Sequence, residues 1–107
     1  MFVATWQFDM KYGTREETFR MVKESRATFA SISGWKAKRT RVLHGSIGAP
    51  ESRVSIEHDF ASLADLESSW AALQTNGEVF RKMISLMKGF IVDGTPRWEV
   101  YRIIDEG

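Results

Sequence analysis

The 107-residue chain contains no cysteine. Disulfide bonds, thiolate metal sites and cysteine nucleophiles are therefore excluded together. Acidic and basic side chains nearly balance at a formal net charge of +1, so charge gives no general argument for binding to nucleic acid or to an anionic membrane. The chain also lacks a run of about 18 consecutive apolar residues, which is the length of a membrane-spanning helix.

The first residues have neither the basic region nor the cleavage site of a secretory signal, and they alternate like a β-strand instead. Hydrophobic residues make up 43% of the chain and charged residues 27%, which is the balance of a soluble globular protein. A chain of this length can build one hydrophobic core. We therefore expect a cytoplasmic protein that folds as a single domain over residues 1–107.

Four segments have the pattern of β-strands. In residues 2–8 apolar side chains alternate with smaller or polar ones, and residues 52–60 alternate in the same way, with His58 in the apolar set. Residues 35–44 are rich in lysine and arginine, which is typical of an edge strand protected from unwanted pairing. Residues 97–104 form the last predicted strand.

A first helix is predicted from residue 15 to residue 33. Thr14 and Glu17 have the spacing of a capping box, in which each side chain satisfies a free backbone N–H group. Gly34 follows at the position where a helix often ends in a left-handed conformation. The inner stripe of this helix contains Thr18, Met21, Val22, Ser25, Phe29 and Ile32.

A second helical unit follows the third strand and is interrupted. Ser62 and Asp65 predict its N-terminal cap, and the sequence "TNG" at residues 75–77 breaks it. Thr75 and Glu78 repeat the capping-box spacing, so a third, short helix should follow the break. The apolar stripe of that helix has the spacing i, i+3, i+4, i+7 and consists of Phe80, Met83, Ile84 and Met87.

The predicted order is strand, helix, strand, strand, split helix, strand, which is the βαββαβ pattern of ferredoxin-like α+β folds. Right-handed crossovers place both helical units on one face of a four-stranded antiparallel sheet. RNA-binding RRM domains share this order, but the strand "RVSIEHDF" lacks the exposed aromatic side chains that stack on bases. We therefore expect no nucleic-acid partner.

The sheet face away from the helices has a mixed character. It collects Val3, Tyr101 and Ile103 together with the charged Arg53 and Glu57. A solvated face is one interpretation, because antiparallel sheets often face water on one side. A second copy of the sheet related by a two-fold axis would also cover this mixture. We expect the protein to form a homodimer through this sheet face.

One stretch resembles a known superfamily. The split helical unit "FASLADLESSWAALQTNGEVFRKM", followed by a turn and "WEVYRII", is similar to the dimeric α/β-barrel proteins. It is most similar to NIPSNAP-like proteins and more distantly to antibiotic-biosynthesis monooxygenases and EthD-type proteins. The resemblance implies two ferredoxin-like subunits packed sheet to sheet, each with a small cavity between its sheet and its helices. It includes no catalytic motif and implies no particular reaction.

The candidate site residues are His58, Trp6, Trp70 and Phe80. His58 is the candidate general base, since imidazole changes charge near neutral pH, and the alternative is a half-buried histidine hydrogen-bonded to backbone. Trp6, Trp70 and Phe80 are expected around any pocket, because tryptophan N–H groups need partners and often line sites for flat ligands. The alternative is that they are simply large core residues.

The sequence gives no ground for a metal or another cofactor. His44 and His58 lack metal-binding spacing, and no carboxylate motif surrounds either of them. Some proteins with this barrel handle haem, but nothing in this chain selects it. We therefore predict no metal site and no other cofactor.

Three functions remain open. The first is the binding of a small apolar or aromatic molecule in the cavity between sheet and helices. The second is a cofactor-independent monooxygenase-like enzyme, in which His58 removes a proton and the substrate itself activates oxygen. The third is a structural or interaction dimer without catalysis.

Overall fold

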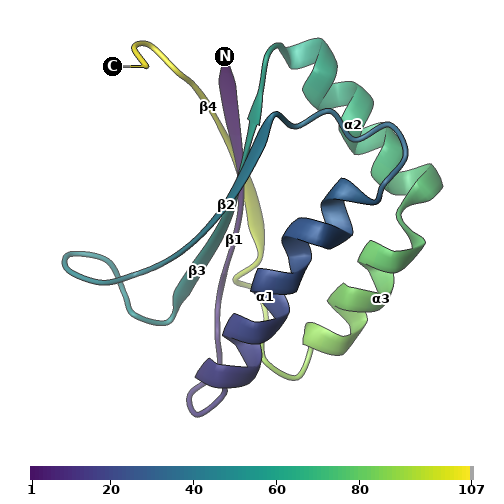
Figure 1. Cartoon of the computed structure of the whole chain (residues 1–107). Coiled ribbons are helices and arrows are strands. Elements are labelled where there is room, and N and C mark those ends of the chain that lie inside the picture. Colours follow the sequence, from purple (N-terminus) through teal and green to yellow (C-terminus); the bar gives the residue numbers. More distant parts are fainter. Residues whose placement is uncertain (107) are drawn as a thin grey trace.

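A computed structural model describes residues 1–106 of the chain, and its elements follow the predicted order (Figure 1). The order is strand, helix, strand, strand, split helix, strand, as in the ferredoxin-like pattern. Their bounds are β1 Phe2–Asp9, α1 Arg15–Ala30, β2 Arg39–His44, β3 Arg53–Phe60, α2 Leu63–Asn76, α3 Glu78–Met87 and β4 Arg97–Arg102.

The four strands form one antiparallel sheet in the order β2-β3-β1-β4. The two apolar strands β1 and β3 are central, and the basic strand β2 lies at an edge, as predicted. Ala4 of β1 stands opposite His58 on one side and Val100 on the other. The three helices of residues 1–106 lie on the same side of the sheet, so within the described residues the opposite face carries no helix (Figure 1).

The hydrophobic core fills the layer between the sheet and the helices. Alternation along β1 and β3 directs one set of side chains toward the helices, and α1 and α3 meet them with their apolar stripes. Thr18 and Ser25 of α1 are fully buried in this layer, so polar side chains also belong to the inner stripe. The largest fully buried apolar side chains of this cluster are Phe8, Val22, Phe29, Val54, Ile56 and Met87.

The predicted strand at residues 35–44 begins four residues later in the structure, at Arg39. The chain leaves α1 through turns, in which Trp35 N donates to Ile32 O and Gly34 has a φ of +90°. The Trp35 ring then packs into the core instead of joining the sheet. The first helix consequently ends at Ala30, three residues before the predicted end.

Of the three predicted N-terminal caps, only that of α2 is present. The Ser62 side chain accepts a hydrogen bond from Asp65 N at 3.1 Å. Thr14 has a φ of −108° and a ψ of 13°, which is not the extended conformation that a cap needs, and its hydroxyl donates to Lys11 O. The predicted capping box at Thr14 was therefore wrong.

The capping box predicted before α3 was also wrong. The Thr75 hydroxyl donates to Ala71 O within α2, because Thr75 still belongs to that helix. Gly77 occupies the N-cap position of α3 and has no side chain to accept a hydrogen bond. The predicted break between the two helices is confirmed. No helix among residues 1–106 is long and apolar enough to cross a membrane.

Candidate functional site

An apolar pocket of about 390 Å³ opens beside α3, between the sheet and the segment that leads to β4. Aromatic and aliphatic side chains dominate its wall, and two exposed charged residues, Lys88 and Asp93, also border it. The apolar part of the wall consists of Trp6, Phe80, Ile84, Ile91, Pro96 and Trp98.

Sheet register and helix spacing bring these side chains together. Trp6 and Trp98 stand directly opposite each other on β1 and β4, so both rings lie on the helix-covered face. Phe80 and Ile84 are four residues apart on α3 and therefore share one side of the helix. The rings of Trp6 and Phe80 meet edge to face, with centroids 6.4 Å apart. The pocket thus has one wall from the sheet and one from α3.

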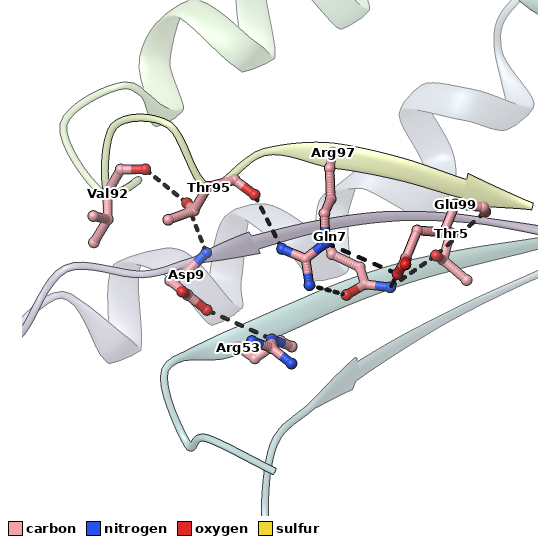
Figure 2. A network of polar contacts seen from close by, with 8 residues as sticks. All are labelled: Thr5, Gln7, Asp9, Arg53, Val92, Thr95, Arg97 and Glu99. Atoms are coloured by element: carbon pink, nitrogen blue, oxygen red, sulfur yellow. Dashed lines mark hydrogen bonds and ion pairs between the residues drawn. The ribbon is translucent and has the colours of Figure 1, made fainter.

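The segment between α3 and β4 closes the pocket and is held firmly to the sheet. Figure 2 shows the Thr95 hydroxyl, which accepts a hydrogen bond from Asp9 N at 3.0 Å and donates one to Val92 O at 2.6 Å. Ile91 pairs with Met10 in an isolated β-bridge. Gly94 has a φ of +80°, a conformation that a side chain would strain. These contacts fix the position of the third wall.

His58 is fully buried on β3, deeper than the half-buried alternative considered from the sequence. Its Nδ1 lies 2.9 Å from the Thr40 hydroxyl, and its ring packs against Phe29 and Trp35 at centroid distances of 4.4 and 5.0 Å. Burial lowers the pKa of His58 to about 4, so the imidazole is neutral at pH 7. With a pKa this low, the neutral imidazole is a weak base and takes a proton readily only from an acidic group.

The structure brings the four predicted site residues into one aromatic layer but into two places within it. Trp6 and Phe80 line the pocket, whereas His58 and Trp70 lie next to Trp98, with ring centroids 6.1 and 5.8 Å from it. Trp98 is therefore the wall shared by the pocket and the aromatic group around His58.

Sequence reasoning missed two residues of this layer, Trp98 and Trp35. Alternation along residues 97–104 places Trp98 on one face of its strand, but only the register with Trp6 shows that this face is the covered one. Trp35 was assigned to a strand, and nothing in its neighbourhood indicates that its ring turns inward. In the part of the chain that the structure describes, no three histidine or acidic side chains gather into a metal site.

The open face of the sheet has a different chemistry, because its charged groups pair with one another. Arg41 Nη2 lies 2.6 Å from Glu57 Oε1, and a further network runs along β1 and β4 (Figure 2). There Gln7 Nε2 donates to Glu99 Oε1 at 2.6 Å, and Arg97 Nη2 donates to Gln7 Oε1 at 3.0 Å. Most charged groups of this face are thus paired, and the exceptions are Arg53 Nε and Asp9 Oδ1, which lie 3.8 Å apart without a hydrogen bond among the described residues.

Comparison with known proteins shows the fold. No model of a protein family and no curated protein sequence matches the chain. A NIPSNAP family protein from Agrobacterium tumefaciens matches 98% of this chain with 94% of its own, at a TM-score of 0.73 and 20% identity. A NIPSNAP-like domain protein from Burkholderia xenovorans matches 99% of this chain with 87% of its own, at a TM-score of 0.73 and 12% identity.

A third solved structure is SnoaB from Streptomyces nogalater, a cofactor-independent oxygenase. It matches 97% of this chain with 93% of its own, at a TM-score of 0.68 and 12% identity. Identities this low show a common fold and leave the activity open. The chain therefore has the ferredoxin-like α+β fold of solved NIPSNAP family proteins and of a cofactor-independent oxygenase, as the resemblance in its sequence predicted.

Proposed function

We propose that the protein binds a small apolar or aromatic molecule in the pocket between its sheet and α3. The observation that carries the proposal is a pocket of about 390 Å³ with a mostly apolar wall. This volume falls within the range of about 300–1,000 Å³ in which proteins hold small ligands. Trp6, Phe80 and Trp98 present aromatic surfaces from two sides, which suits a flat ligand.

Titration with naphthalene, followed by calorimetry, tests this proposal. We expect saturable binding to one site, and we expect Ile84→Trp to abolish it because the larger ring fills the pocket. Leu86→Trp is the matched control, since Leu86 lies on the same helix and is 70% exposed. Equal binding by wild type and both variants would place the naphthalene elsewhere and contradict the proposal.

We also propose that two copies pack through their open sheet faces into an α/β barrel. Tyr101 pairs with Val3 and Leu43 with Ser55, so both lie on this face, where they are 52% and 44% exposed. No helix within residues 1–106 lies on this side of the sheet (Figure 1). The charges beside them are already paired, as in Arg39 with Asp59 at 3.1 Å, so burial of the face leaves few isolated charges. Isologous two-fold packing is the commonest way to cover such a surface.

Light scattering on the whole chain measures the molar mass in solution and so tests this assembly. We expect a dimer for the wild type and a monomer for Tyr101→Asp, because an unpaired carboxylate would be buried at the interface. Val79→Asp on the exposed side of α3 is the control and should remain dimeric. A wild-type chain that stays monomeric at high concentration would contradict the assembly.

A monooxygenase-like activity is the second candidate function, favoured by the Nε2 atom of His58. This atom is shielded from solvent and has no hydrogen-bond partner within residues 1–106. In this function Nε2 removes a proton from an aromatic substrate, whose carbanion reduces dioxygen directly. His58→Ala should then abolish turnover and leave substrate binding nearly unchanged, and equal loss of both would count against His58 as the base. Binding without turnover would support only the binding of a small molecule. Dimerisation without binding or turnover would support an interaction protein.

A further inference from the structure

We propose that the ligand of the pocket carries a hydrogen-bond acceptor, namely a carbonyl or carboxylate oxygen. This oxygen binds to the ring nitrogens of Trp35, His58 and Trp70, which form an inner polar subsite. This inference rests on the proposed binding function and specifies the class of molecule. It predicts that a flat apolar body occupies the pocket while one oxygen reaches the aromatic group around His58.

The first observation is a set of three shielded ring nitrogens. Trp35 Nε1, His58 Nε2 and Trp70 Nε1 are buried from solvent and have no hydrogen-bond partner among residues 1–106. Buried polar groups in native proteins are nearly always hydrogen-bonded, because an unmade bond is destabilising. Three unpaired ring nitrogens in one layer of a small domain therefore point to a polar atom that arrives from outside the chain.

The second observation is that these rings, from three different segments, form one connected group. Trp35 precedes β2, His58 lies on β3 and Trp70 lies on α2. Trp35 packs on His58, and Trp98 links His58 to Trp70. Ala4 lies within this group, because it stands beside His58 in the sheet and packs near Trp35, Trp70 and Trp98. Its side chain is only a methyl group.

The chemistry of the nitrogens selects the ligand atom. An indole N–H is a donor only, so Trp35 and Trp70 both require an acceptor. The neutral imidazole of His58 is adaptable. If the Thr40 hydroxyl donates to Nδ1, then Nε2 carries the proton and is a third donor; in the other tautomer Nε2 accepts. Two fixed donors and one adaptable group fit a carbonyl or carboxylate oxygen and do not fit a pure hydrocarbon.

The position of Trp98 connects the subsite to the pocket. Its ring lines the pocket and also packs on Trp70 and His58. The Trp98 ring is half-buried, and in the proposed arrangement the oxygen of a ligand in the pocket passes the edge of this ring to reach the ring nitrogens. Trp6 and Phe80 contact the apolar body of the ligand in this arrangement, and Trp35 and Trp70 contact its oxygen.

The test compares two probes of similar shape, naphthalene and 2-acetylnaphthalene, by calorimetry on the whole chain. We expect the ketone to bind about tenfold more tightly, which corresponds to the net gain from one or two hydrogen bonds to otherwise unpaired donors. Trp35→Phe and Trp70→Phe remove an N–H group and keep an aromatic ring. Each should reduce the preference for the ketone severalfold while the naphthalene affinity changes little.

Trp6→Phe is the control, because Trp6 lines the pocket apart from the subsite. It should change both affinities by the same factor and keep the preference for the ketone. Thermal unfolding shows whether each variant folds. Loss of an unpaired donor removes a destabilising group, while the smaller phenyl ring removes some packing. If the preference survives in both Trp35→Phe and Trp70→Phe, the subsite does not recognise the oxygen.

The outcomes separate this inference from the proposed function. Equal affinities of the wild type for the two probes would overturn the inference, because the nitrogens would then gain nothing from an oxygen, and the binding function would stand. Failure of both probes to bind would overturn the binding function and the inference together. Binding of the ketone alone would support both and show that the oxygen is essential.

Discussion

The polar groups on the two faces of the sheet have different surroundings. On the open face, Gln7 joins Arg97 and Glu99, and the arginines of β2 pair with carboxylates of β3, so most of the polar groups pair within the surface. Arg53 Nε and Asp9 Oδ1 on this face make no hydrogen bond among the described residues, and they lie 3.8 Å apart as an ion pair. On the covered face, ring nitrogens of His58 and Trp70 are shielded by aromatic neighbours and lack partners among the described residues. The unpaired polar atoms of the open face therefore lie beside an opposite charge, whereas those of the covered face lie among aromatic rings.

This difference separates two roles. A surface whose charges are already paired can be covered by another copy without leaving a charge isolated, although each exposed pair contributes little free energy. A buried aromatic layer with unpaired ring nitrogens favours a ligand that supplies their partners. We therefore propose assembly through the open face and ligand recognition at the covered face.

The largest expected effect is on packing at the covered face. Phe29 is 1% exposed, and its ring contacts those of Trp35, His58 and Phe80. Phe29→Ala should lower the free energy of unfolding by about 3–5 kcal/mol, because it removes buried area and leaves a cavity. Urea denaturation measures this change, with the exposed Val79→Ala as control. A loss below about 1 kcal/mol would show that the aromatic layer is loosely packed.

The second-largest effect is expected from acid, which should lower the free energy of unfolding by protonating His58. Its pKa is lowered to about 4 in the folded chain and lies near 6.5 when unfolded, so between these values the unfolded chain binds more protons. The free energy of unfolding should therefore fall by about 3 kcal/mol as the pH is lowered from 6.5 to 4, and it should be insensitive to His58 above that window.

Denaturation at a series of pH values measures this effect, and His58→Phe should remove that part of the slope. His44→Gln replaces the other histidine, at the exposed end of β2, and should leave the slope in place. A wild-type chain with the same pH dependence as His58→Phe would mean that water or a polar group reaches the imidazole, and the contrast between the faces would be smaller than the structure shows.

The smallest effect is expected on the open face. Arg41 pairs with Glu57 at 2.6 Å, yet the arginine side chain is 46% exposed. In the monomeric Tyr101→Asp background, Arg41→Ala should therefore change the free energy of unfolding by less than about 1 kcal/mol, and less at high salt. Denaturation at low and high salt measures this. A loss of several kcal/mol in that background would show that the pair contributes more than its exposure indicates.

Much of the fold follows from local patterns in the sequence. The alternation in residues 52–60 places His58 on the covered face, and the Ser62 cap starts α2 where the spacing to Asp65 predicts it. These features depend on side chains a few residues apart, so a local pattern contains the necessary information. The threonine caps failed because a hydroxyl caps a helix only when its own backbone is extended, and the sequence does not determine that conformation at Thr14.

The site was predictable only in part, because its geometry depends on contacts between distant segments. Trp6 and Phe80 belong to apolar stripes that the sequence shows, and both line the pocket. Trp98 joins them through the register of β4 with β1, a pairing across more than 90 residues. The unpaired ring nitrogens of Trp35 and Trp70 are also a tertiary property, since the sequence shows an indole without showing what surrounds it.

The most direct test of ligand recognition at the covered face is a crystal structure of the protein grown with 2-acetylnaphthalene. We expect density for the naphthalene ring between Phe80 and Trp98, with the carbonyl oxygen within hydrogen-bond distance of Nε1 of Trp70 or Trp35. Density for the probe on the open sheet face, or a ring in the pocket with its oxygen turned out to solvent, would contradict it.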